Sequence, residues 1–178
     1  MKRISLPVLL VLIICASLIY LEPIPGLAQE NSVRLRVGER LEYRVDVKGI
    51  PVGEQVMTVL AETEYEGRPV YHIEMELRNY AAFSLFYTFY EKDLLYLDRQ
   101  TMFPLYIKRE IMEKRETTTE EIKFFPKEKK VEITEWEGQE VKKEVFPMNK
   151  PCLENLSLVY YLRNRPWRNE QHSFLFLT

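Results

Sequence analysis

Few side chains in this sequence have the type and spacing that metal binding requires. The histidines are His72 and His172, and neither has a second histidine or a cysteine at ligand spacing. A zinc site needs three or four clustered ligands, so we expect His72 to have a surface or hydrogen-bonding role. The sequence also lacks a glycine-rich phosphate loop. We therefore predict no metal site and no cofactor.

Nucleophilic catalysis has equally little support. Cys152 is the only cysteine after residue 28, so no intrachain disulfide is expected there, and a lone thiol is usually buried as a small hydrophobe. A Cys152–His172 pair would rest only on the presence of both residues. Ser157 does not lie in a Gly-x-Ser-x-Gly turn. Carboxylates are many, so a paired-carboxylate site stays open, although no pair stands out. We predict no catalytic residue and a protein that is not an enzyme.

Aromatic side chains are the densest chemical feature of the chain, between Asn79 and Tyr90. Spacing of i, i+3, i+4 and i+7 among four of them favours a short helix. One interpretation is a plug that packs on the apolar face of a sheet. The other is the lining of an apolar ligand cavity. The candidate lining residues are Phe83, Phe86, Tyr87, Phe89 and Tyr90.

The elements that would position these residues are mostly strands. In the stretch Gly38 to Gly53, apolar Leu41, Tyr43, Val45 and Val47 alternate with charged residues. A period of two places the apolar set on one face of a strand. The same alternation recurs from Gln55 to Thr63 and from Val70 to Arg78. Three consecutive runs of this kind are typical of an antiparallel meander with one buried face.

Further strands and one helix are expected along the rest of the chain. The predicted strands are Leu94–Leu97, Pro104–Met112, Glu120–Phe125, Val131–Trp136, Val141–Phe146 and Ser173–Leu177. The predicted helix is Leu153–Arg163, ended by Asn164-Arg-Pro166. The predicted fold class is mainly β (α+β): a curved, half-barrel-like antiparallel meander sheet. One C-terminal helix and the short aromatic helical segment would pack on its apolar face.

The first 28 residues have the features of a secretory signal peptide. Lys2 and Arg3 precede an apolar run from Ile4 to Leu21, and Gly26-Leu27-Ala28 suits cleavage after Ala28. The alternative is an uncleaved membrane anchor, since the run approaches the ~20 residues that span a bilayer. We predict a signal peptide over 1–28 and a single β-rich exported domain over 29–178, with no permanent membrane span after cleavage. We expect a periplasmic or cell-envelope location.

Charge argues against one class of partner. The 178 residues carry a net charge of −2, and loss of Lys2, Arg3 and Glu22 with the leader makes it −3. Phosphate binding needs a basic excess, so no nucleic acid partner is predicted. The mixed Lys and Glu residues from 108 to 144 are instead typical of a solvated face.

Several stretches resemble one family. The sequence GERLEYRVDVKGIPVGE from Gly38 is similar to the opening signature of an exported bacterial family, domain of unknown function 3108. Similar stretches are Tyr65–His72, Phe83–Tyr87, Leu97–Leu105 and Leu156–Arg163. The resemblance implies an exported β-rich domain and no assigned activity. Compared with that family pattern, the chain departs at Asn155 and ends early, which suggests C-terminal truncation.

Two functions of different classes follow from these observations, and a third is less supported. The first is a non-enzymatic binding module whose aromatic residues hold a lipid, an acyl chain or another apolar ligand. The second is a structural or assembly partner of an envelope protein, with the apolar face serving only as a core. The third is an envelope hydrolase, which would need a polar cleft with perturbed titratable groups.

Overall fold

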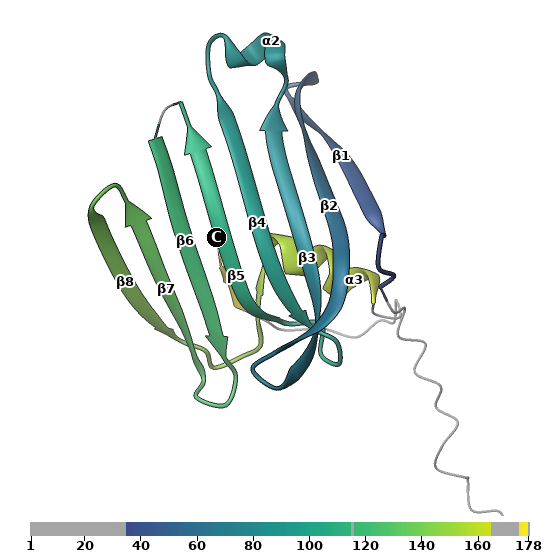
Figure 1. The fold of residues 1–178 in the computed structure, drawn as a ribbon, viewed down its shortest axis with the longest axis vertical. Helices are drawn as coiled ribbons and strands as arrows, with labels where there is room; N and C mark the ends of the chain where they lie inside the picture. Colours follow the sequence, from purple (N-terminus) through teal and green to yellow (C-terminus); the bar gives the residue numbers. More distant parts are fainter. Residues whose placement is uncertain (1–34, 115, 165–174, 178) are drawn as a thin grey trace, which may run out of the picture. The chain divides into compact units, whose positions relative to one another are not determined.

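The alternating pattern forms one continuous meander. The computed structural model describes residues 35–114, 116–164 and 175–177, without the side chains of 175–177. Strands β1 to β8 follow one another in the sheet in chain order, and every neighbouring pair is antiparallel (Figure 1). The strands are β1 (Arg40–Val47), β2 (Ile50–Tyr65), β3 (Arg68–Asn79), β4 (Phe89–Asp98), β5 (Pro104–Glu113), β6 (Glu116–Phe125), β7 (Lys130–Glu137) and β8 (Glu140–Pro147). The predicted fold class, mainly β with a curved antiparallel meander, is confirmed.

Two helices and a small second sheet complete the described residues. Helix α2 (Ala81–Ser84) lies between β3 and β4, and helix α3 (Asn155–Arg163) follows β9 (Cys152–Glu154). Strand β10 (Leu175–Leu177), the described part of the predicted strand Ser173–Leu177, pairs with β9 in parallel. Neither helix in the described part of the chain has the length and apolarity required to span a bilayer. The predicted signal peptide lies outside the described residues.

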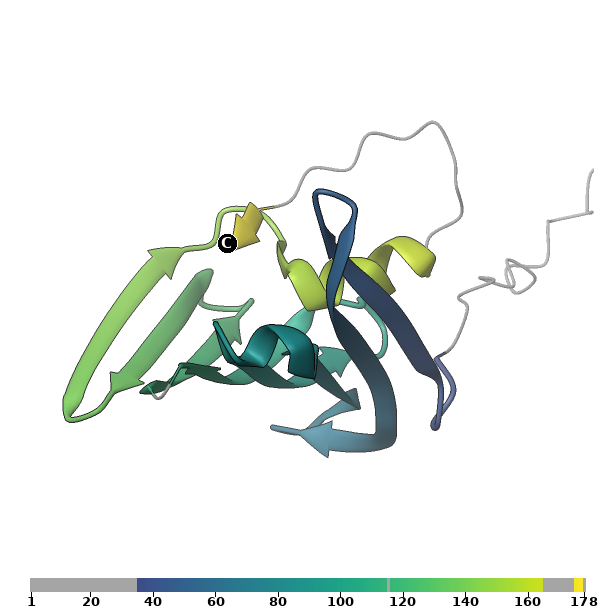
Figure 2. The ribbon, with the colours of Figure 1, turned by 90° about the horizontal axis from the view of Figure 1, so that it is seen from above.

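The sheet curves around α3. Figure 2 looks along the strands and shows α3 inside the concave side of the sheet. The pairing register shifts at Val45/Asp46, Val59/Ala61 and Tyr96/Leu97. Such irregular steps bend a strand and increase its twist, which helps the sheet to close partly around the helix.

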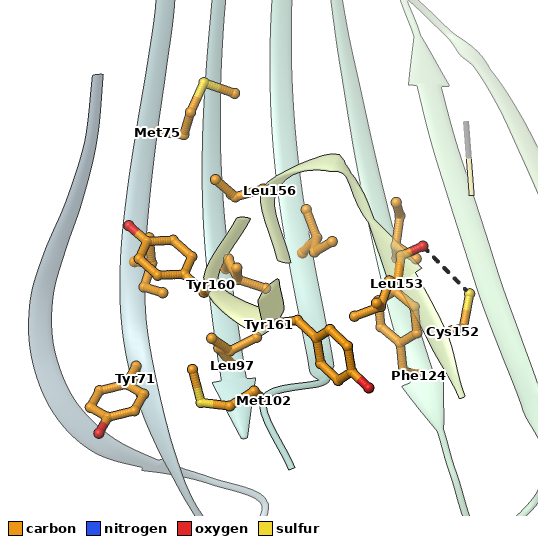
Figure 3. Packing of buried hydrophobic residues seen from close by; sticks show 14 of the residues in the cluster. Tyr71, Met75, Leu97, Met102, Phe124, Cys152, Leu153, Leu156, Tyr160 and Tyr161 are labelled. Atoms are coloured by element: carbon orange, nitrogen blue, oxygen red, sulfur yellow. Dashed lines mark hydrogen bonds between the residues drawn. The ribbon is translucent and has the colours of Figure 1, made fainter. Parts of the chain in front are cut away.

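The core lies between the concave face and α3. Directly paired residues of adjacent strands share a face, and one cross-strand row is apolar over six strands. This row is Val59, Ile73, Leu95, Ile107, Ile122 and Ile133. Leu153, Leu156, Tyr160 and Tyr161 cover the concave face from β9 and α3, and all four are buried (Figure 3).

The aromatic segment does not pack on the apolar face of the sheet, where we predicted it. The helix covers only Ala81–Ser84, and none of its residues is buried. Phe86 is 88% exposed, and Phe89 already belongs to β4. The interpretation of a core plug packed on the apolar face was therefore wrong. The core is closed instead by α3, whose aromatic Tyr160 and Tyr161 occupy the place we had assigned to the plug.

Candidate functional site

The five aromatic residues predicted to line a cavity are spread over different surfaces. Phe83 belongs to α2, and Phe86 projects into solvent. Phe89 alternates in phase with Leu95 and faces the concave side, whereas Tyr90 faces the convex side and its hydroxyl lies 3.3 Å from Glu76. Tyr87 stacks on Phe89, with ring centroids 6.5 Å apart. None of the five lines the two pockets described below, and their contact with a ligand stays a prediction.

An apolar pocket lies at the other end of the sheet. It has a volume of about 350 Å³ and opens between the β4–β5 loop, the β6–β7 turn and the linker that follows β8. Its apolar lining is Phe103, Pro104, Leu105, Phe124, Pro126, Met148, Pro151 and Cys152. Leu105, Phe124, Met148 and Cys152 are buried, so the floor of the pocket is continuous with the core. This size and lining fall within the range of small-molecule sites, roughly 300–1,000 Å³.

A buried carboxylate shapes one wall of this pocket. Asp98 is buried at the end of β4, and its Oδ1 accepts hydrogen bonds from the backbone N–H groups of Gln100 and Thr101, at 3.0 and 2.8 Å. Its Oδ2 lies 2.6 Å from Nη2 of Arg68. An aspartate that accepts from the backbone two and three residues ahead fixes a turn. The position of Phe103 and of Arg68 at the pocket therefore depends on Asp98.

The rim of the pocket is basic. Arg68, Lys129 and Lys150 line it, and no carboxylate appears among its described lining residues. Arg68 is already paired with Asp98, whereas Lys129 is exposed in a turn with a positive φ of 55°. An apolar cavity with basic groups at its mouth suits a ligand that has an apolar body and an anionic end.

Charged residues occupy the concave face above the apolar row. The cross-strand row two residues further along contains Met75, Asp93, Arg109, Glu120, Glu135 and Lys142. Asp93 is fully buried, and Glu154 approaches the same point from the start of α3. From β4 to β8, the concave face therefore changes from apolar to charged residues within one step of the strand period, whereas Met57 and Met75 keep the row apolar on β2 and β3.

Arg109 is the centre of a buried ionic cluster. Its Nη2 lies 2.9 Å from Oδ2 of Asp93 and 2.7 Å from Oε1 of Glu154. Glu91 and Glu120 lie 3.1 and 3.4 Å from the same guanidinium. We call these five residues the Arg109 cluster. Four carboxylates surround one cation, so the cluster carries excess negative charge whenever all of its acids are ionised.

This excess and the burial shift the protonation of the acids. Burial raises the pKa of Asp93 to about 7, although hydrogen bonding to Arg109 opposes the shift. Burial also raises the pKa of Glu91 and of Glu120, again against the attraction of Arg109. Asp93 therefore titrates near neutral pH, where most aspartates are fully ionised.

The Arg109 cluster joins the helix to the sheet. Glu154 is the N-cap of α3: its Oε2 accepts from the Leu156 N–H at 2.9 Å, while its Oε1 binds Arg109. The Ser157 hydroxyl accepts from the Glu154 N–H at 2.9 Å, which completes a capping box. Ser157 thus has a structural role in the helix start, consistent with its position outside any nucleophile motif.

An acidic pocket borders the Arg109 cluster on the concave face. Its volume is about 390 Å³, and its lining is Arg109, Ile111, Glu113, Glu116, Thr118, Glu120, Glu135 and Glu137. No group of histidine, cysteine and carboxylate side chains within the described ranges could hold a metal ion. Asp93, the acid with the most perturbed pKa, does not line the pocket and is buried behind Arg109.

His72 lies outside the core, whereas Cys152 is part of it. His72 lies on the convex face, where its ring meets the edge of Tyr96 with centroids 5.3 Å apart, and its Nε2 is buried without a hydrogen-bond partner among the described residues. Cys152 is buried as predicted, and burial raises the pKa of its thiol to about 11. A thiol of that pKa is protonated at neutral pH and is a poor nucleophile. His172 lies outside the described residues.

Sequence reasoning missed the Arg109 cluster, although part of the signal was present. Glu91 and Asp93 are in phase with Leu95 and Leu97 and therefore share their inward face. A strand drawn only from Leu94 to Leu97 excluded both acids. A longer strand would have placed two carboxylates on the core side, where a basic partner is required.

Comparison with protein families gives one assignment. Residues 42–175 match the model of the family described as "Protein of unknown function (DUF3108)". The chain belongs to this family. The resemblance read from the Gly38 stretch and the four later segments is thus confirmed, and it assigns no activity. Neither the curated proteins nor the solved structures include a significant match to this DUF3108 chain.

Proposed function

We propose that this DUF3108 domain is a non-enzymatic binding module of the cell envelope that holds an apolar ligand with an anionic end, such as an acyl chain. The apolar pocket at the β4–β5 end of the sheet carries the proposal. It has the volume of a small-molecule site, a buried apolar floor and a basic rim. The ligand-lining residues proposed are therefore Phe103, Leu105, Phe124, Met148 and Cys152, in place of the aromatic segment.

Each part of the pocket has a separate role in this proposal. Burial of methylene groups against Leu105 and Phe124 supplies most of the affinity, at roughly 0.8 kcal/mol per buried CH₂. Lys129 is exposed at the mouth and attracts the anionic end. Asp98 keeps Arg68 and the β4–β5 loop in place around the opening.

A fluorescent fatty-acid probe tests the proposal. The protein from Gln29 onward should bind the probe with saturation, and Lys129→Glu should weaken binding because it places a negative charge at the mouth. Lys127→Glu is the matched control, since Lys127 lies in the same turn but does not line the pocket. The proposal fails if the wild-type protein does not bind the probe, or if both substitutions weaken binding equally.

The same probe separates the pocket from the aromatic segment. Phe86→Ala removes an exposed ring from the segment that we first predicted to line a cavity. We expect this variant to bind the probe as the wild type does. A loss of binding in Phe86→Ala with normal binding in Lys129→Glu would assign the ligand to the aromatic segment instead.

One observation favours the second candidate, an assembly partner. All eight residues of the edge strand β8 are exposed, and Val141 and Val145 project from it without cover among the described residues. An uncovered edge strand can pair with a strand of another protein. Crosslinking in cells from a cysteine at Val145 should then capture one partner, and a Val141→Pro substitution should abolish the capture.

A further inference from the structure

Exposed apolar side chains gather at the end of the sheet opposite the pocket. They come from the β1–β2 turn, from the β3–β4 connection and from the end of β5. All three lie at the end that carries the label α2 in Figure 1. We call this group the apolar tip: Val47, Ile50, Leu85, Phe86, Tyr87 and Met112. Single exposed apolar residues are ordinary, whereas a group of this kind marks an interaction surface.

The β3–β4 connection holds its shape without burying its apolar residues. The Asn79 side chain spans the loop: its Nδ2 donates to the Tyr87 carbonyl, and its Oδ1 accepts from the Phe89 N–H at 3.1 Å. The Thr88 hydroxyl donates to the Ser84 carbonyl at 3.2 Å. Leu85 and Phe86 are 84% and 88% exposed. Polar contacts thus fix the loop, while the Leu85 and Phe86 side chains face solvent.

Two lysines flank the tip. Lys114 lies over the Tyr87 ring, with Nζ 6.0 Å from the centroid, and Lys48 is exposed in the β1–β2 turn. Tyrosine and lysine side chains that combine an apolar body with a polar end are typical of a membrane–water interface.

The nearby carboxylates are already engaged or face elsewhere. Asp46 is 2.9 Å from Arg44, and Glu54 is 2.6 Å from Arg78. Glu113 and Glu116 line the acidic pocket on the concave face, and Glu113 is also engaged by the Tyr87 hydroxyl, whose pKa it raises. No ion-pair partner of Lys48 or Lys114 is found among the described residues, so the tip presents positive charge beside its apolar side chains. That charge is complementary to an anionic lipid surface.

We propose that the apolar tip is a membrane-docking surface. Leu85 and Phe86 enter the boundary between headgroups and acyl chains of an anionic bilayer, while Tyr87, Lys48 and Lys114 lie at headgroup level. This inference does not rest on the proposed ligand pocket, which lies at the opposite end of the sheet. It concerns binding on a bilayer surface and involves no membrane span.

Vesicle sedimentation tests this proposal. The protein from Gln29 onward is mixed with vesicles of equal parts phosphatidylcholine and phosphatidylglycerol. We expect it to co-sediment, and we expect a Leu85→Ser/Phe86→Ser variant to bind at least about tenfold more weakly, because two apolar side chains no longer leave water. The matched control is Val141→Ser/Val145→Ser, which removes two exposed apolar residues from β8 and should bind as the wild type does.

Two further measurements test the charge of the apolar tip and its depth in the bilayer. Lys48→Glu/Lys114→Glu should weaken binding by about tenfold or more on anionic vesicles and should change little on pure phosphatidylcholine. Phe86→Trp should show a blue-shifted emission with vesicles, beyond the shift of the wild type.

The proposal is overturned if the wild type does not bind vesicles, or if the β8 control loses as much binding as the tip variant. It is also overturned if the tip variant instead abolishes a dimer detected by sedimentation without lipid.

Discussion

At the scale of single residues, Arg109 is the charged side chain that pairs with all four acids of its cluster. It neutralises two acids that are almost fully buried, Asp93 and Glu154, and it connects the sheet to the N-cap of α3. A buried ion pair adds little compared with apolar residues of the same shape, but the loss of one partner leaves an uncompensated charge. The cluster is therefore sensitive to substitution at its centre.

Arg109→Met should strongly destabilise the domain. The substitution keeps most of the side-chain volume and leaves Asp93 and Glu154 without their cation, which should lower the free energy of unfolding by roughly 3–5 kcal/mol at neutral pH. Urea denaturation measures this. The control is Arg40→Met, which removes an exposed pair with Glu42 and should cost less than about 1 kcal/mol. Equal losses in the two variants would contradict the role given to Arg109.

Asp93 should make the stability of the domain depend on pH. Its folded-state pKa is raised from 3.8 to about 7, so between these pH values the folded state binds more protons than the unfolded state. The free energy of unfolding must then fall as pH rises through this window and level off above about pH 7. The raised pKa values of Glu91 and Glu120 act in the same direction.

Asp93→Asn should flatten that dependence. Between about pH 5 and pH 8, the wild type should lose on the order of 2 kcal/mol more than the variant, at about 1.4 kcal/mol per pKa unit. Urea denaturation across this range provides the comparison. Asp46→Asn, at an exposed position paired with Arg44, should keep the wild-type slope. If Asp93→Asn also kept that slope, Asp93 would not titrate in the way described.

At the scale of elements, α3 covers the apolar face of the sheet, which a second layer of several helices or strands would otherwise cover. Eight strands supply one apolar face, and one helix of nine residues covers it with Leu156, Tyr160 and Tyr161 (Figure 3). Phe103 of the β4–β5 loop extends this layer, since its ring lies 5.2 Å from that of Tyr161. The pocket wall and the helix are thus parts of the same packed region.

A pair of leucines on α3 tests that packing. Leu156 is 2% exposed and Leu162 is 40% exposed. Leu156→Ala should lower the free energy of unfolding by about 2–5 kcal/mol, because it leaves a cavity between helix and sheet. Leu162→Ala makes the same chemical change at the surface, and we expect a loss below about 1 kcal/mol. Similar losses would show that α3 does not bury its Leu156 face.

The strands and the helix could be predicted from the sequence wherever the apolar residues followed a single period. The strict alternation in β1, β2 and β3 predicted a meander. The predicted helix Leu153–Arg163 ends where α3 ends, ahead of the proline, but it begins two residues early because Leu153 and Glu154 belong to β9. The aromatic segment was harder, since Phe83, Phe86, Tyr87 and Tyr90 imitate a helical spacing by coincidence. Their helix ends at Ser84, and Phe89 and Tyr90 already follow the strand period of β4.

The two candidate sites depend on contacts that no local pattern encodes. Arg109 and Glu154 are 45 residues apart, and their ion pair requires the register of β4 and β5 and the position of α3. The apolar pocket combines two turns and a linker from three parts of the chain. Turn and linker positions follow from the folded sheet, so their shared cavity could not be predicted from hydrophobic periodicity.

At the scale of the whole domain, the two ends of the sheet differ in chemistry. The β4–β5 end has an apolar pocket with a basic rim, and the α2 end has exposed apolar residues flanked by lysines. The ionic Arg109 cluster lies on the concave face between them. The two ends can therefore be changed independently, and the tip substitutions should leave probe binding in the pocket intact.

Native mass spectrometry of the protein purified from its own envelope tests the central claim most directly. We predict an adduct with the mass of an acyl-chain ligand, which is lost in Leu105→Trp because the larger ring fills the pocket. Leu85→Trp makes the same substitution at an exposed position and should keep the adduct. Wild-type protein without any adduct, or an adduct that survives Leu105→Trp in a folded variant, would contradict the pocket as the binding site.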